Sequence, residues 1–243
     1  MTDHALESAT MKRFGLIGGT SWHSTVLYYS VINQAINDHF GDNTNPPLVL
    51  FNVNQAKIHQ YQQADNWEAV AEIFIEAGQC LKQANVEQIC FCANTPHKIY
   101  DQFCDQVDIP VLHIAQTTAA AIRSQGISRV AFIGTAYSMQ DDFITSRIAA
   151  QGIEIVVPTD SAVVQELHRI IQQELTFNKV VPESKQWVIQ QLQEMINTGV
   201  QGVVLGCTEF PLMLDQQDLS VPIFDTIQIH AFAAADSILR RST

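Results

Sequence analysis

The chain has 243 residues, of which 47% are apolar, and its formal net charge is −12. This length accommodates one large domain or two of roughly 120 residues, and the negative charge argues against nucleic acid as a partner. No apolar run reaches the ~18 residues that would suggest a membrane span, and residues 1–13 are polar, without the apolar core of a secretory signal. The five cysteines lack metal-site spacing, so free thiols in a reducing cytoplasm and no bound metal are expected.

Strand-like runs alternate with helical patterns along the whole chain. Strands are predicted at 14–19, 48–53, 89–92 and 110–112, and then at 129–134, 153–157, 203–206 and 222–224. Helices are predicted between them, as at 67–84 and 165–175, and from residue 227 onward, where the tail should pack on the first half of the chain. This alternation predicts an α/β fold with mostly parallel sheets covered by helices on both faces.

The two halves of the chain repeat the same order of motifs. The corresponding positions are Gly18 and Gly134, Ala93 and Cys207, and Pro110 and Pro222. We expect two similar Rossmann-like lobes related by pseudo-twofold symmetry, with the active site in the cleft where their strand ends converge. The first lobe is expected at 12–112 plus 227–243 and the second at 113–226, after a polar extension at 1–11. A single domain with a chance repeat is the alternative.

Cys207 is the strongest candidate for catalysis, because it follows Gly206 at the end of an apolar strand and precedes Thr208 and Glu209. A thiol at a helix N-terminus has a lowered pKa, so we expect one that exchanges a proton near neutral pH. A small buried apolar residue is the alternative interpretation of this cysteine.

Polar residues end three other predicted strands. Asn94 and Thr95 follow the 89–92 strand, where Thr95 suits a helix N-cap before Pro96 and Asn94 is left for a ligand. Thr20, Ser21 and Thr135 follow glycines, and Ser21 and Thr135 are candidate donors to a carboxylate; ordinary turn residues are the alternative. No dinucleotide-binding glycine motif is present.

Several motifs together resemble the aspartate/glutamate racemase family, within the Asp/Glu/hydantoin racemase superfamily, and most of all its broad-specificity amino-acid racemase branch. The motifs are Gly-Gly-x-Ser-Trp-x-Ser-Thr (18–25), Asn-Thr-x-His-Lys (94–98), Leu-His-Ile-Ala (112–115), Gly-Thr-x-Tyr-x-Met (134–139), Gly-Cys-Thr-Glu (206–209) and Phe-Asp-Thr (224–226). The resemblance implies a two-lobed, cofactor-independent isomerase of an amino-acid substrate, and a homodimer is one expected assembly. It also implies one acid/base residue per lobe, acting on opposite faces of the substrate's α-carbon.

This chain departs from the family pattern at the first acid/base position. The resemblance places that residue immediately before Asn94, where the family normally has cysteine and this chain has Ala93. Cys92 lies one residue early, so its side chain should face the packing unless a bulge rotates it. The predicted substrate-binding residues are Thr20, Ser21, Asn94, Thr95, Thr135, Thr208 and Glu209, with Lys57 as the only nearby cation in the 53–60 segment.

Three functions follow from these observations. The leading prediction is an amino-acid racemase with Cys207 as acid/base. Ala93 would then make turnover weak, or one-directional with water as the second proton carrier, unless this alanine is an introduced substitution. A single-cysteine decarboxylase of the same superfamily needs only one acid and tolerates Ala93. The third is a carboxylate- or amino-acid-binding protein without catalysis.

Overall fold

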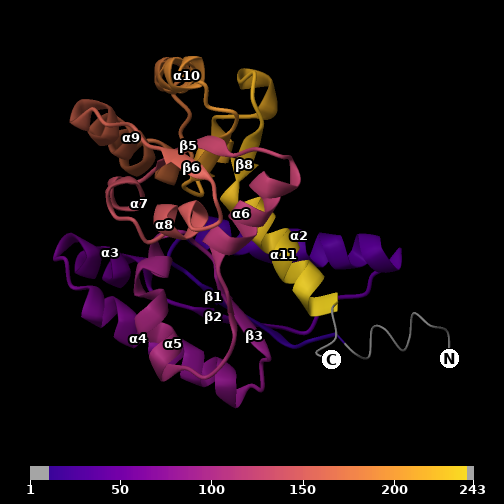
Figure 1. Cartoon of the computed structure of the whole chain (residues 1–243). Coiled ribbons are helices and arrows are strands. Elements are labelled where there is room, and N and C mark those ends of the chain that lie inside the picture. The colour runs from indigo at the N-terminus through magenta and orange to yellow at the C-terminus, as the bar shows by residue number, and fades with distance from the viewer. Residues whose placement is uncertain (1–10, 240–243) are drawn as a thin grey trace. The chain divides into compact units, whose positions relative to one another are not determined.

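The computed structural model describes residues 11–239, and the chain forms two compact units (Figure 1). Unit 1 contains the chain up to His113 and the segment from His230 onward, and unit 2 is Ile114–Ile229. Of the extension predicted at 1–11, only Met11 is among the described residues.

Unit 1 is an α/β unit around one parallel sheet. Its strands are β1 (Phe14–Gly18), β2 (Leu48–Asn52), β3 (Gln88–Phe91) and β4 (Val111–Leu112), in the order β2-β1-β3-β4. Its helices are α2 (Trp22–Phe40), α3 (Gln55–Gln63), α4 (Trp67–Gln83), the 3-10 turn η1 (Thr95–Ile99), α5 (Tyr100–Gln106) and the second part of α11 (Thr226–Leu239).

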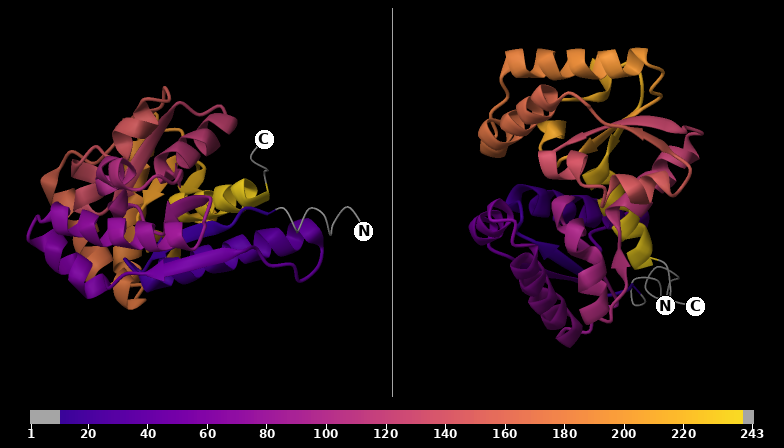
Figure 2. Two further views of the ribbon diagram at one scale, coloured as in Figure 1. Left: turned by 90° about the horizontal axis from the view of Figure 1, so that it is seen from below. Right: turned by 60° about the vertical axis from the view of Figure 1, so that its left-hand side comes forward.

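Unit 2 repeats this plan. Its strands are β5 (Arg129–Gly134), β6 (Glu154–Val156), β7 (Val203–Gly206) and β8 (Ile223–Asp225), in the order β6-β5-β7-β8. Its helices are α6 (Ile114–Ser124), α7 (Ala136–Gln140), α8 (Thr145–Ala149), α9 (Ser161–Gln173), α10 (Pro182–Asn197) and the 3-10 turns η2 (Leu175–Phe177), η3 (Phe210–Leu212) and η4 (Gln216–Asp218). In each unit, helices cover both faces of the sheet (Figure 2).

The strand register shows that the two sheets are built alike. Ile17 of β1 pairs with Phe91 of β3, and Ile133 of β5 pairs with Leu205 of β7. Two residues beyond Phe91 stands Ala93, and two residues beyond Leu205 stands Cys207. The strand register therefore supports the correspondence between Ala93 and Cys207, which lie 114 residues apart. The predicted pair of α/β lobes with parallel sheets is confirmed.

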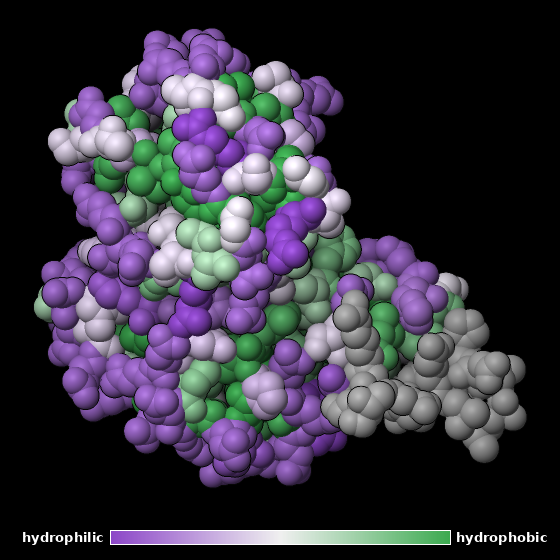
Figure 3. Space-filling model, viewed as in Figure 1, coloured by the Kyte–Doolittle hydropathy of each residue, from purple (hydrophilic) through white to green (hydrophobic). Residues whose placement is uncertain are grey.

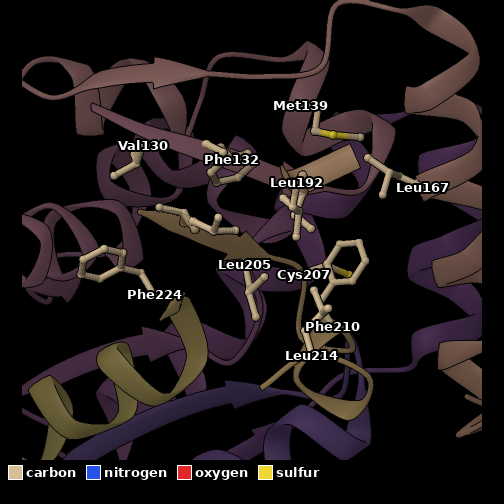
Figure 4. Close-up of a cluster of buried hydrophobic side chains, with 14 of the residues drawn as sticks. Val130, Phe132, Met139, Leu167, Leu192, Leu205, Cys207, Phe210, Leu214 and Phe224 are labelled. Carbon is tan, nitrogen blue, oxygen red and sulfur yellow. The ribbon is translucent and has the colours of Figure 1, made fainter. Parts of the chain in front are cut away.

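Each unit has its own apolar core. The core of unit 1 packs Phe74, Phe91 and Phe103 edge to face, and the described tail also belongs to this unit, where Lys12 N donates to Ile238 O at 3.0 Å. In unit 2, Phe132 and Leu205 lie in the buried cluster that reaches Cys207 (Figure 4). These cores hold the central strands rigidly, as a precise site at their ends requires.

The surface is mainly hydrophilic on the face shown in Figure 3, including the region of α3 and α4. Over residues 11–239, no helix combines the length and the apolar character that crossing a bilayer needs.

Candidate active site

Cys207 lies directly after β7, where the buried strand gives way to polar residues. Its side chain is 6% exposed and belongs to the apolar cluster of unit 2, beside Phe210 (Figure 4). The thiol donates a hydrogen bond to Glu209 Oε2 at 3.0 Å. A buried thiol is thus joined to a half-buried carboxylate two residues along the chain, which gives its proton a defined acceptor.

The predicted lowering of the Cys207 pKa is wrong. Burial raises the pKa of this thiol well above its usual value, and the negative charge and hydrogen bond of Glu209 raise it further. Backbone N–H groups of Glu209 and Thr208 oppose the rise, but they are the smaller influence. Only the short 3-10 turn η3 follows, so the sulfur lacks the dipole of a regular helix. The resting group is therefore a protonated thiol.

The corresponding strand end in unit 1 carries no proton-exchanging side chain. Ala93 is 6% exposed, the same fraction as Cys207, but ends in a methyl group. Cys92 is 2% exposed, and its backbone N–H donates to Ile17 O at 2.9 Å, one residue beyond the assigned end of β3. The Cys92 thiol contacts Cys90, and burial together with this thiol raises the pKa of Cys90. The structure thus places Cys92 in the buried packing beside Cys90.

The turn after Ala93 differs from the sequence prediction in its start. A 3-10 helix begins at Thr95, so Asn94 rather than Thr95 occupies the cap position, and the Asn94 side chain forms no cap bond. Pro96 is compatible with the first turn of this helix. A backbone N–H there has no partner within the helix, whether the cap is Asn94 or Thr95, so the N–H that proline lacks is not needed. Asn94 is 3% exposed and Thr95 is half-buried.

Ser21 and Thr135 have matching structural roles. Each is the N-cap of the next helix: Ser21 Oγ accepts from Ser24 N in α2, and Thr135 Oγ1 accepts from Ser138 N in α7. In both helices a serine three residues after the cap hydrogen-bonds back to the cap carbonyl. Ser24 Oγ donates to Ser21 O and Ser138 Oγ donates to Thr135 O, both at 3.0 Å. Capping explains both predicted donors, and a further role toward a carboxylate stays a prediction.

Ser24 connects this cap to the candidate site in unit 1. The same hydroxyl lies 2.9 Å from Cys92 O, so its one proton is shared between Ser21 O and Cys92 O. Helix α2 thereby holds the backbone that leads into Ala93. The sequence contained no signal for this contact, since the two residues are separated by 68 positions.

The remaining predicted residues fall at different depths. Thr20 is 8% exposed, and its Oγ1 is buried without a hydrogen-bond partner among the described residues. Thr208 is half-buried beside Cys207. Lys57 is exposed in α3, with Nζ 5.8 Å from the ring centre of Tyr61.

A buried histidine cluster supports the turn after β3, and sequence reasoning missed it. His97 Nδ1 donates to Ala93 O at 3.0 Å, so the ring carries its proton on Nδ1. The centre of the His97 ring lies 4.5 Å from the ring centre of His113 and 5.8 Å from that of His230. His230 Nε2 donates to Leu112 O at 3.0 Å, so Nδ1 accepts from the hydroxyl of Tyr28 at 2.7 Å.

Burial lowers the pKa of His97 well below its ordinary value, helped by the charges that His113 and His230 would carry. Burial also lowers the pKa of His230 to about 4. At neutral pH both rings are therefore uncharged and serve as fixed hydrogen-bonding groups.

His168 is the second missed residue, at the corresponding loop of unit 2. Its Nδ1 accepts from Ala136 N at 3.3 Å, directly after Thr135, and partial burial lowers its pKa. Within residues 11–239, no three His, Cys, Asp or Glu side chains gather as a set of metal ligands.

Comparison with known proteins gives the same picture. The family description Asp/Glu/Hydantoin racemase matches residues 17–234. A solved structure of a putative Asp/Glu racemase from Yersinia pestis is 38% identical, with a TM-score of 0.90 over 95% of this chain and 100% of that one.

Two curated relatives are more distant in sequence. A glutamate racemase from Streptococcus suis (strain 05ZYH33) is 28% identical over 148 residues, 60% of this chain; the match spans about half, 54%, of that relative. The broad specificity amino-acid racemase RacX from Bacillus subtilis (strain 168) is 22% identical over 160 residues, 65% of this chain and 68% of that protein. The family match and the register of the two sheets lead to one conclusion: the chain belongs to the Asp/Glu/hydantoin racemase family.

Proposed function

We propose that this protein is a cofactor-independent amino-acid racemase in which Cys207 exchanges the α-proton of the substrate. The observation that supports this most directly is the hydrogen bond of 3.0 Å from the Cys207 thiol to Glu209. The related racemases of Streptococcus suis and Bacillus subtilis add support for amino acids as the substrate class.

The first step is a proton transfer within the Cys207–Glu209 pair. Moving the thiol proton to Glu209 creates a thiolate and a neutral carboxylic acid, so the total charge of this partly buried pair stays at −1. This avoids the cost of adding charge to a buried site. The backbone N–H groups of Thr208 and Glu209 that contact the sulfur stabilise the thiolate.

The second step breaks the substrate's Cα–H bond and forms an S–H bond on Cys207. The electron pair from the C–H bond delocalises into the substrate carboxylate, giving an enediolate with two negatively charged oxygens. Such a species needs hydrogen-bond donors already aimed at it, and we assign this role to Thr208, Thr135, Asn94 and Thr95. Return of the proton from the same thiol restores the original configuration.

Inversion requires a second proton donor on the opposite face of the α-carbon. Ala93, at the strand end that corresponds to Cys207, has no proton to give. With alanine at this position, we expect exchange of the α-proton with solvent to be faster than racemisation, since only water can deliver a proton to the other face.

An isotope experiment tests this function. Amino acids are incubated with the protein in deuterium oxide, and proton NMR follows the loss of the α-proton signal. We expect exchange in the natural chain, loss of exchange in Cys207→Ala, and no change in Cys80→Ala, which alters an exposed thiol in unit 1. Exchange that survives in Cys207→Ala would contradict the assignment.

Decarboxylation is the second candidate, favoured specifically by the protonated resting state of Cys207. An acid alone suffices to protonate the carbanion left by carbon dioxide loss, so the methyl group of Ala93 is no obstacle. Release of carbon dioxide from an arylmalonate, lost in Cys207→Ala and accompanied by no α-proton exchange with amino acids, would replace the racemase proposal. Ligand binding unchanged in Cys207→Ser, without either reaction, would instead indicate a binding protein.

A further inference from the structure

A cavity of about 410 Å³ opens beside the candidate site in unit 1, at the ends of β1 and β2. Six residues line it: Gly19, Trp22, Asn52, Val53, Asn54 and Gln55. We propose that this cavity is the substrate side-chain subsite and that it selects amino acids with a neutral carboxamide side chain over dicarboxylates. The inference rests on the proposed function and names its substrate class.

The sheet order places the cavity within reach of position 93. β1 lies between β2 and β3, and neighbouring strands are roughly 5 Å apart. Gly19, at the end of β1, is therefore one strand spacing from Ala93, and Asn52, at the end of β2, is about 10 Å away by the same spacing. A substrate with its α-carbon near position 93 can extend a side chain of three or four atoms into this space.

The backbone around the cavity is fixed. Gly19 has φ +93°, and a Cβ atom at this position would lie 2.2 Å from Val53 O. The loops after β1 and β2 are thus in close contact, and Val53 N also donates to Gly18 O at 2.8 Å. Trp22 adds an indole that is 57% exposed. The cavity is preformed, which lowers the entropy cost of binding.

The lining suits an amide better than a carboxylate. None of the six lining residues is charged, and three of them carry side-chain amides. Asn54 Oδ1 accepts from Lys57 N at 3.3 Å, and Asn52 Nδ2 makes only a long contact of 3.4 Å to Val53 O. Side-chain amides offer donors and acceptors together, as a carboxamide does, whereas an ionised carboxylate only accepts.

Charge disfavours a dicarboxylate further. Lys57, the nearest lysine or arginine in sequence, does not line the cavity, and its ammonium lies over the ring of Tyr61. The chain as a whole carries a net charge of −12. A second substrate carboxylate finds no cation to pair with among the lining residues, whereas the isosteric amide can both donate to and accept from their side-chain amides.

Binding to the full-length protein tests the proposal without relying on turnover. Isothermal titration with glutamine, glutamate, asparagine and aspartate, each as both enantiomers, compares side chains of equal length. We expect each amide to bind at least tenfold more tightly than the acid of the same length. Equal or tighter binding of the acids, or no binding of any of the eight probes, would overturn the proposal.

A charge-insertion variant locates the effect. Asn52→Lys places a cation at the cavity and should shift the preference at least tenfold toward glutamate, while Gln60→Lys adds the same charge at an exposed position of α3 outside the lining. The same shift in both variants would overturn the assignment to this cavity.

The proposed function can fail separately. The methyl side chain of alanine is too short to reach the subsite, so exchange of its α-proton in deuterium oxide reports on Cys207 alone. Exchange of the alanine α-proton without a preference for amides would support the proposed enzyme activity and contradict the subsite. Amide-selective binding without α-proton exchange of any amino acid, in both the natural chain and Ala93→Cys, would support the subsite and contradict the racemase proposal.

Discussion

Cys207 and Glu209 form a hydrogen-bonded pair in which the carboxylate raises the pKa of the thiol and also accepts its hydrogen bond. These two effects have opposite consequences for reactivity. Burial and the charge of Glu209 keep the resting sulfur protonated, while the proposed mechanism uses the same carboxylate as the base that receives the thiol proton. Removing the carboxylate should therefore separate thiol acidity from catalytic competence.

The Glu209→Gln variant tests this separation. Burial still raises the pKa of Cys207, but the contribution of the Glu209 charge is gone, so the pKa should fall. The pH midpoint for alkylation of Cys207 by iodoacetamide, mapped by mass spectrometry, should move to lower pH. Exchange of the substrate α-proton should slow by 10²-fold or more, because general-base assistance contributes roughly this much. A faster exchange that accompanies the lower pKa would show that Glu209 only restrains the thiol.

Ser24 should stabilise the strand end that carries Ala93. The Ser24→Ala variant removes the donor to Cys92 O and leaves a buried carbonyl with a lost hydrogen bond, which costs about 1–3 kcal/mol of unfolding free energy. Ser124 is the matched control, since its hydroxyl donates to Ala121 O within its own helix and the residue is exposed. Urea unfolding should show a loss in Ser24→Ala that is clearly larger than in Ser124→Ala; equal losses would contradict the role of Ser24.

Because its buried histidines are uncharged, we expect the free energy of unfolding of this protein to fall as the pH is lowered. In the unfolded chain an imidazole titrates near its ordinary pKa of about 6.5, whereas burial lowers the pKa of His230 to about 4 in the folded protein. Between these values the unfolded chain binds a proton that the folded one excludes, so stability decreases as pH falls. For His230 the loss is on the order of 3 kcal/mol at pH 4.

Urea unfolding from pH 7.5 to 4.5 measures this effect against the variant His230→Gln. The variant should be less stable at pH 7.5, because the hydrogen bonds to Tyr28 and Leu112 are disturbed, but its stability should decline less with acid. His39→Gln, an exposed position in α2, should follow the natural chain. Parallel declines for the natural chain and His230→Gln would show that His230 does not contribute.

Gly19 should be intolerant of any side chain. Its backbone has φ +93°, and a Cβ would lie 2.2 Å from Val53 O. Gly126 is the control, because it also has positive φ, at +69°, but a Cβ there meets nothing within 4 Å. We expect Gly126→Ala to cost about 1 kcal/mol for its left-handed backbone and Gly19→Ala to cost at least about 2 kcal/mol more, since backbone must move. Equal melting temperatures would contradict the close approach of the two loops.

The paired sheets were predictable from sequence because the signal is local. Short apolar runs that end in glycine and polar residues, such as the one from Val203 to Gly206, specify a buried parallel strand and the point where it stops. The same local pattern at Ile89–Cys92 placed the strand within one residue. The offset between Ala93 and Cys207 then followed from counting, and the register of both sheets agrees with it.

The chemistry around these positions depends on tertiary structure, which the sequence does not display. The sequence predicts that a helix dipole lowers the pKa of Cys207. In the structure only the three-residue 3-10 turn Phe210–Leu212 follows, so burial and the charge of Glu209 determine the pKa and raise it. His97 and His230 come from separate segments and meet only in the folded unit. Ser21 and Thr135 looked like ligand donors, yet both cap helices, and a sequence cannot distinguish these two uses of a hydroxyl.

The Ala93→Cys variant tests the racemase proposal most directly, because it introduces a thiol at the position where the proposal expects the second acid/base residue. Chiral chromatography and α-deuterium incorporation are measured together for a panel of enantiopure amino acids, in the natural chain, Ala93→Cys and the double variant Ala93→Cys/Cys207→Ala. We expect exchange with little inversion in the natural chain, racemisation at least tenfold faster in Ala93→Cys, and loss of racemisation in the double variant. Absence of both exchange and racemisation in Ala93→Cys, in a protein with unchanged circular dichroism, would contradict the racemase assignment.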